Sequence, residues 1–302
     1  MPKTNWDNFE FKDYINVSEI EIGELPKGVS ISTMCATCKL GDPKTTKILG
    51  PNIVKYLSLC QDDVISIKSN SKVNSLIPEK KKRRSKKKPK EQKKKKGNHF
   101  YNQVTVVVRL THGPTEDISK EPKINLKLFN NGSVQMSGCK SMNGINIALN
   151  KILHRLKEVK GVKNEDSITV IKFADSPEIP LGVYKFKVDM INSNYQVNLV
   201  INREKFYNLL LQKRIRSSYE PCIRACVIVK YVPPEENEAE KDISIFVFEK
   251  GNIIITGAKR KSHIMSSYNY INNIIMDHSH EIEKTDLDSI IMNSEFKDLM
   301  AS

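Results

Sequence analysis

Apolar and polar residues alternate along several short stretches of the chain and recur with helical spacing along others. Alternation predicts strands, because successive side chains of a strand point to opposite faces, and a spacing of three to four residues predicts helices. Two series are found, each with a strand, a helix and a second strand: "VSISTMCATCKL" (29–40), "TTKILGPNIVKYLSL" (45–59) and "QVTVVVRL" (103–110); then "YKFKVDMINSNYQV" (184–197), "NREKFYNLLLQKR" (202–214) and "CIRACVIVKYV" (222–232). The same order of elements is therefore predicted twice.

A twelve-residue phrase also occurs twice, as "FNNGSVQMSGCK" (129–140) and "FEKGNIIITGAK" (248–259). Each copy follows a β-rich run, so Gly132 and Gly251 are predicted to be hairpin turns between antiparallel strands. A helical pattern with one apolar face follows each copy. The apolar positions are Ile145, Leu149, Ile152 and Leu156 in the first half, and Ile264, Tyr268, Ile271 and Ile275 in the second. The pattern indicates an internal duplication of two α/β half-units related by pseudo-twofold symmetry.

The second copy of the phrase predicts a sheet face that no helix covers. Alternation places Ile253 and Ile255 on one face of the strand and Ile254 and Thr256 on the other. Helices can cover one face of such a sheet. The other face is then a binding surface, or another segment of the same chain covers it.

The net charge of +14 comes almost entirely from one segment. The run "KKKRRSKKKPKEQKKKK" (80–96) holds 13 basic residues and one acid, so the rest of the chain is nearly neutral. Such a block is typical of a solvated loop, and it suggests nuclear import or contact with phosphates; a solubilising loop with no partner is the alternative. No secretory signal or membrane-spanning run of about eighteen apolar residues is found, so we expect an intracellular protein.

Neither a metal site nor an enzyme site is predicted. In "CATC", Cys35 and Cys38 are three apart in a strand and should point to opposite faces, so they are expected to be structural thiols. The six histidines show no metal-ligand spacing. The sequence contains no phosphate-binding loop, dinucleotide fingerprint, nucleophile elbow or HExxH motif. We therefore expect no catalytic residues and no cofactor.

"SSYEP" (217–221), followed by a strand, "FEKGNIIITGAK" and a helix, resembles the carboxy-terminal repeat of the TATA-box-binding protein family. The similarity is strongest from Asn202 to Asp277 and is weaker but co-linear from Gly28 to Glu158. It implies an α+β saddle of two pseudo-symmetric repeats, in which a curved antiparallel sheet binds DNA with its concave face and carries helices on its convex face. The expected domains are an acidic and aromatic extension (1–27), repeat 1 (28–160) with a Lys-rich insertion (79–97), a linker (161–184), repeat 2 (185–280) and an acidic tail (281–302).

The resemblance also implies a set of DNA-binding residues. The wedges that enter the base stack are matched by Phe129 and Phe248, whereas the two outer wedge positions hold Gln103 and Arg224, with Phe100 as a substitute for one of them. The central asparagine positions hold Thr33 and Met190, with Asn192 near the second. The remaining positions are groove-facing Ser137, Thr256, Gln135 and Ile254, and the phosphate-contacting cations Arg109, Lys140, Lys230 and Lys259.

The implied partners are A·T-rich double-stranded DNA, a TFIIB-like initiation factor and a multisubunit RNA polymerase. The factor would dock on the loop that holds Tyr219, Glu220 and Ile223. The segment 1–27 is either a DNA mimic that covers the concave face or a disordered tail. Because the Lys-, Asn- and Ile-rich composition is typical of an A·T-rich genome, we expect a large DNA virus or a divergent protist as the source, and the nucleus or a viral transcription compartment as the location. A scaffold of the same fold that has lost DNA recognition and binds proteins is the alternative function.

Overall fold

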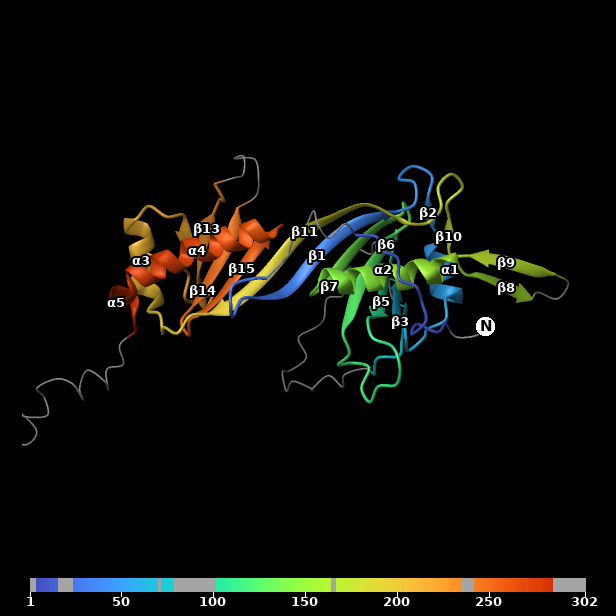
Figure 1. The fold of residues 1–302 in the computed structure, drawn as a ribbon, viewed down its shortest axis with the longest axis horizontal. Coiled ribbons are helices and arrows are strands. Elements are labelled where there is room, and N and C mark those ends of the chain that lie inside the picture. Colours follow the sequence, from blue (N-terminus) through green and yellow to red (C-terminus); the bar gives the residue numbers. More distant parts are fainter. Residues whose placement is uncertain are drawn as a thin grey trace, which may run out of the picture. The chain divides into compact units, whose positions relative to one another are not determined.

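The computed structural model describes residues 4–15, 24–69, 72–78, 102–163, 167–234 and 242–284. These residues form two compact units (Figure 1). Unit 1 contains the described residues of Met1–Glu19 and Thr33–Asp189, and unit 2 contains those of Ile20–Ser32 and Met190–Ser302. The Lys-rich run and Phe100 lie outside the described residues.

Unit 1 is an antiparallel sheet with helices packed on one face. The strands follow one another in space as β1 (Ser30–Leu40), β7 (Ser133–Cys139), β6 (Lys123–Phe129), β5 (Gln103–Arg109), β3 (Val64–Ser69) and β4 (Lys72–Ser75). Helix α1 (Gly50–Tyr56) packs on β3 and β5, and helix α2 (Met142–Lys157) packs on β5, β6 and β7. Two small sheets complete the unit: β2 (Lys47–Ile48) with β10 (Ala174–Asp175), and the hairpin of β8 (Val159–Lys163) and β9 (Ile168–Lys172).

Unit 2 repeats this plan. Its strands follow one another as β12 (Ser217–Ser218), β13 (Cys226–Tyr231), β14 (Ile243–Phe248), β15 (Asn252–Ala258) and the second part of β11 (Val183–Gln196). Helix α3 (Arg203–Gln212) packs on β12 and β13, helix α4 (Lys261–Asp277) packs on β14 and β15, and α5 (Ser279–Ile282) follows α4. The predicted fold class, α+β with antiparallel sheets and helices on one face, is confirmed.

The alternation of the strands decides which side chains enter the core. In β15, Ile253 and Ile255 are fully buried, whereas Ile254 and Thr256 are half-buried on the opposite face. In β1, the same rule buries Cys38 and leaves Cys35 on the other face. The predicted apolar positions of α2 are all buried, and those of α4 are buried except Tyr268, which is half-buried.

One predicted helix is much shorter than its sequence pattern. The helical pattern over residues 45–59 yields only α1, because Pro51 stands in its first turn and Lys47–Ile48 pair with β10 instead. No helix in the described parts of the chain is both long enough and apolar enough to cross a lipid bilayer.

Both predicted turn glycines adopt a left-handed backbone. Gly132 has a φ of 77° and Gly251 a φ of 75°, and each donates its N–H to the carbonyl of the phenylalanine three residues earlier, at 3.0 Å. A β-carbon at Gly132 would lie 3.1 Å from the carbonyl oxygen of Leu40, and one at Gly251 would collide with the carbonyl oxygens of Val197 and Leu199. The neighbouring backbone therefore leaves no room for a side chain at Gly251, whereas at Gly132 the contact is tight but a small adjustment would relieve it.

The amino-terminal segment lies on helix α2. The backbone of Lys12 exchanges two hydrogen bonds with the Asn150 side chain, at 2.9 and 2.8 Å, and Trp6 is buried with its ring 5.4 Å from that of His154. Helix α2 packs on the opposite face of the sheet from the one proposed to meet DNA. For residues 4–15, both the predicted DNA mimic and the disordered tail are therefore wrong.

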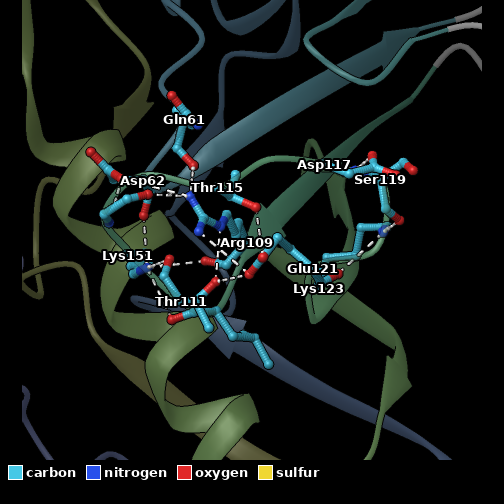
Figure 2. Close-up of polar contacts among 12 residues, drawn as sticks. Gln61, Asp62, Arg109, Thr111, Thr115, Asp117, Ser119, Glu121, Lys123 and Lys151 are labelled. Carbon is cyan, nitrogen blue, oxygen red and sulfur yellow. Dashed lines mark hydrogen bonds and ion pairs between the residues drawn. The ribbon is translucent and has the colours of Figure 1, made fainter.

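Arg109 is buried in a polar cluster rather than presented on the surface (Figure 2). Its guanidinium donates to Thr111 Oγ1 at 2.8 Å and to the carbonyl of Gly113 at 2.9 Å, and it lies 3.4 Å from the carboxylate of Glu121. Hydrogen bonds from Thr111 and Thr115 lower the pKa of the Glu121 carboxyl. With a residue exposure of 1%, Arg109 holds the loop after β5 in place and is not available for the phosphate contact that the resemblance implies.

Lys151 of α2 also stabilises the loop after β5, by hydrogen bonds to its carbonyl groups. Its ammonium is fully buried and lies 5.3 Å from the Trp6 ring. It donates to carbonyl oxygens at 2.7–3.1 Å, those of Asp62, Arg109, Leu110 and Thr111. Burial lowers its pKa to about 8, although Asp63 and Asp62 act in the opposite direction.

We expect Gly251→Ala to destabilise unit 2 more than Gly28→Ala does. Both glycines have positive φ, and a left-handed non-glycine residue costs roughly 1–3 kcal/mol. Only at Gly251 does the new β-carbon also meet backbone carbonyls, because nothing lies within 4 Å of one at Gly28. Urea unfolding followed by tyrosine fluorescence measures the difference, and equal losses for the two variants would contradict the close approach.

Lys151→Met should lower the free energy of unfolding by at least about 2 kcal/mol, because it leaves buried carbonyls without a donor. The folded pKa of Lys151 is about 8 and the unfolded value is 10.5, so the unfolded chain binds more protons between these values. Wild type should therefore gain stability over the variant as the pH rises through that interval. A stability difference that stays constant between pH 7 and 10.5 would contradict the lowered pKa.

Candidate nucleic-acid interface

The face of the unit 2 sheet that faces away from α3 and α4 is apolar at its centre. The pairing of β14 with β15 sets Phe246 opposite Ile254 and Ser244 opposite Thr256, and all four are half-buried. On the next strand, Asn192 lies opposite Thr256, whose hydroxyl donates to Asn192 Oδ1 at 2.5 Å. A patch of aliphatic, aromatic and amide groups is thus open to a ligand.

The corresponding face of the unit 1 sheet, which faces away from α1 and α2, is polar. Register sets Lys127 of β6 opposite Gln135 of β7, and Asn125 opposite Ser137. Thr33 continues this face on β1, with its side chain half-buried. The predicted groove-facing residues of unit 1 are therefore brought together on one open surface.

Phe129 and Phe248 occupy the same place in the two units. Each is the last residue of its strand, is half-buried, and precedes the glycine turn. Their cross-strand neighbours differ, since Gln103 lies opposite Phe129 and Cys226 lies opposite Phe248. An aromatic ring at the strand end and on the open face can contact a ligand.

Arg224 does not occupy the position expected for it. The register of β13 places Cys226 opposite Phe248, and Arg224 lies two residues earlier in an exposed loop, where its N–H donates to the Glu220 carbonyl at 2.8 Å. The counterpart of Gln103 in the sheet is therefore Cys226, and the predicted match of Gln103 with Arg224 is wrong there.

Three of the four predicted phosphate contacts are exposed cations. Lys140 directly follows β7 and Lys259 directly follows β15, so the two mark equivalent strand ends. Lys230 lies on β13, where its ammonium donates to Ser244 Oγ at 2.7 Å. Arg109 is the exception, because it is buried under the loop after β5.

The predicted partner loop protrudes between β12 and β13. Glu220 is exposed, and Ile223 is 72% exposed. The Tyr219 ring lies 5.7 Å from the guanidinium of Arg203, which also donates to the Ala225 carbonyl at 3.0 Å. The base of the loop is anchored and its tip is presented to solvent.

Three cations on the open face of unit 1 were not among the predicted residues. Lys39, Lys185 and Lys187 line a hollow together with Phe129 and Gln135. The alternation in "YKFKVD" would have indicated that Lys185 and Lys187 share a face, but not that β11 runs beside β1 there.

Two of the thiols in the described residues are buried in unit 1. Burial raises the pKa of Cys38 and of Cys139 to about 12, so both stay protonated at neutral pH. Across the same part of the chain, no group of histidine, cysteine, aspartate and glutamate has an arrangement suited to a metal ion.

Comparison with known proteins identifies the relatives of this chain, although no protein-family model matches it. It is 30% identical over 259 residues to a TATA-box-binding protein-like protein of Acanthamoeba polyphaga mimivirus, covering 82% of this chain and 65% of that protein. It is 24% identical over 149 residues to TATA box-binding protein-like 2 of Rattus norvegicus, covering 49% of this chain and 35% of the rat protein.

The chain thus spans less than two thirds of the length of these relatives. Among solved structures, the Methanococcus jannaschii TBP aligns with a TM-score of 0.47 and 18% identity, covering 82% of this chain and 98% of that one. On the similarity to the mimivirus protein, the chain belongs to the TATA-box-binding protein-like family.

Proposed function

We propose that this protein is a TBP-like transcription initiation factor that binds A·T-rich promoter DNA through the minor groove and bends it. The supporting observation is that a half-buried phenylalanine, Phe129 or Phe248, stands at the same strand end on the open face of each unit. The names of the relatives agree with a role in transcription.

The physical argument starts from the shape of a sheet. A broad sheet face is too wide for the major groove, so it must widen the minor groove, which presents little beyond an A·T-versus-G·C pattern. Apolar wedges that enter a base step unstack it and bend the duplex by roughly 20–90°. The patch of Phe246, Phe248 and Ile254 has the apolar character that such contacts need.

The cations and amides give this face its other contacts. Lys140 and Lys259 at matching strand ends are placed to meet the phosphates on either side of a widened groove. Asn192, held by Thr256, offers an amide to the acceptors of A·T pairs. These groups position the duplex, while the wedges distort it.

We further propose that the loop with Tyr219, Glu220 and Ile223 recruits a TFIIB-like factor, and through it an RNA polymerase. The anchored base and exposed tip of the loop suit a docking site. Such a protein would work in the nucleus or in a viral transcription compartment.

A protein-binding scaffold of the same fold is the second candidate. This alternative is favoured because the residues opposite Phe129 and Phe248, Gln103 and Cys226, are not aromatic. Among the described residues, each unit therefore has one phenylalanine at this strand end and lacks a second wedge beside it. On this alternative the open face binds a protein and DNA bending is absent.

We expect end-labelled FRET on a short duplex to report a bend with an A·T-rich core and less bending with a G·C-rich core. Phe248→Ala and Phe129→Ala should each weaken binding by about 1–3 kcal/mol, the usual range for a base–aromatic contact, and reduce the bend. Leu211→Ala, which removes an exposed apolar side chain from α3, is the matched control and should change neither. Equal binding to both duplexes without a bend would favour the scaffold.

Glu220→Arg and Ile223→Asp should weaken binding of a TFIIB-like factor to the preformed DNA complex by about tenfold or more, since each places the wrong chemistry on the exposed tip of the loop. DNA affinity should stay at the wild-type value. Gel-shift titration of the factor measures the effect. A supershift that both variants leave unchanged would exclude this loop as the docking site.

A further inference from the structure

The open faces of the two units carry different chemistry at matching positions. Lys127 and Gln135 lie opposite each other in unit 1, where the corresponding pair in unit 2 is Phe246 and Ile254. The two pairs occupy the same place relative to the repeated turn, two strand residues before Phe129 and before Phe248. A charged and amide pair in one half is thus replaced by an aromatic and aliphatic pair in the other.

The strand beside this pair shows the same contrast. Lys39 of β1 lines the hollow of unit 1 that holds Phe129, and its ammonium donates to the Asn131 carbonyl at 3.1 Å. Gln196 of β11 is its counterpart in unit 2, and it donates to the Lys250 carbonyl at 3.1 Å. Both side chains reach back to the turn, but only the one in unit 1 is charged.

The first part of β11, which lies beside β1, adds two more cations in unit 1. Lys185 and Lys187 reach the hollow from β11, and Lys187 lies 3.3 Å from the carboxylate of Asp189. Lys185 has a φ of 50°, a left-handed conformation that costs energy for a residue other than glycine. In unit 2 the corresponding strand presents Ser30 and Ser32, which hydrogen-bond to Asn194 and Asn192.

We propose that the two halves divide DNA recognition between them. The open face of unit 1 binds the phosphate backbone through Lys39, Lys127, Lys185 and Lys187, and that of unit 2 makes the apolar contacts that distort base steps. Four ammonium groups against the carboxylate of Asp189 leave this face positive, so that it attracts a polyanion and releases its counterions. The patch of Phe246, Phe248 and Ile254 offers aromatic and aliphatic groups at the matching place. The inference rests on the proposed DNA binding and makes that binding asymmetric: beside the phenylalanine and the strand-end lysine that the two units share, unit 1 adds phosphate contacts and unit 2 adds apolar contacts.

The test is the salt dependence of binding of the full chain to an A·T-rich duplex, by fluorescence anisotropy from low to high KCl. The triple variant Lys39→Gln, Lys127→Gln, Lys187→Gln should flatten the slope of log K against log salt by up to about 0.9 for each phosphate that the protein no longer neutralises. The control triple variant Lys55→Gln, Lys205→Gln, Lys213→Gln removes the same charge from exposed positions on or next to α1 and α3. It should leave the slope within about 0.5 of wild type, which is less than the change expected for one phosphate.

The reciprocal pair of variants, Phe246→Ala and Ile254→Ala, should keep the wild-type slope while lowering affinity, bend and preference for A·T. The division of labour is overturned if the two lysine triples flatten the slope equally, or if the apolar variants change the slope as much as the lysine variants change it. If wild type shows no DNA binding at any salt concentration, the proposed function fails and this inference fails with it. Binding and bending by wild type, with no difference between the triples, would retain the function and remove only the division.

Discussion

In the part of the chain that the structure describes, helices pack on only one face of the main sheet of each unit, and the other properties of this protein follow from that constraint. In β15, the buried side of the alternation supplies Ile253 and Ile255 to the core under α4, which leaves Ile254 and Thr256 on the face that α4 does not cover. An antiparallel sheet can leave one face open without losing backbone hydrogen bonds, because those bonds lie within the sheet. The open face can therefore evolve for binding while the covered face maintains the fold.

The two glycine turns show how strongly the fold holds the repeated phrase. Gly132 and Gly251 adopt the same left-handed conformation. The carbonyl oxygens of the segment after β11 occupy the space of a side chain at Gly251, and the carbonyl oxygen of Leu40 comes close to that space at Gly132. The phenylalanine before each turn is thereby fixed at the end of its strand. Packing thus accounts for part of the repetition of the phrase.

Outside the repeated phrase, the two units have diverged. Unit 1 has a buried Arg109 and Lys151 under the loop after β5, and an amino-terminal segment that closes over α2 with Trp6. Cys226 stands opposite Phe248 where Gln103 stands opposite Phe129, so the same register carries different residues at the two strand ends. The duplicated plan therefore keeps the sheet, its register at these strand ends and the turns constant, while charge and the covering of the helices differ.

Local patterns in the sequence determined the order of the strands and helices that the two halves repeat, the two turns, the residues of these elements that face the core, and the equivalence of Phe129 with Phe248. These properties depend on neighbouring residues, since the period of a strand or helix and the preference of glycine for positive φ act over a few positions. Tertiary structure alone decided the burial of Arg109, the packing of residues 4–15 on α2, the position of Arg224 in a loop and the meeting of Lys39 with Lys185 and Lys187. Each of these depends on contacts between segments far apart in the chain, and strand register and side-chain burial are set by the packing of whole elements.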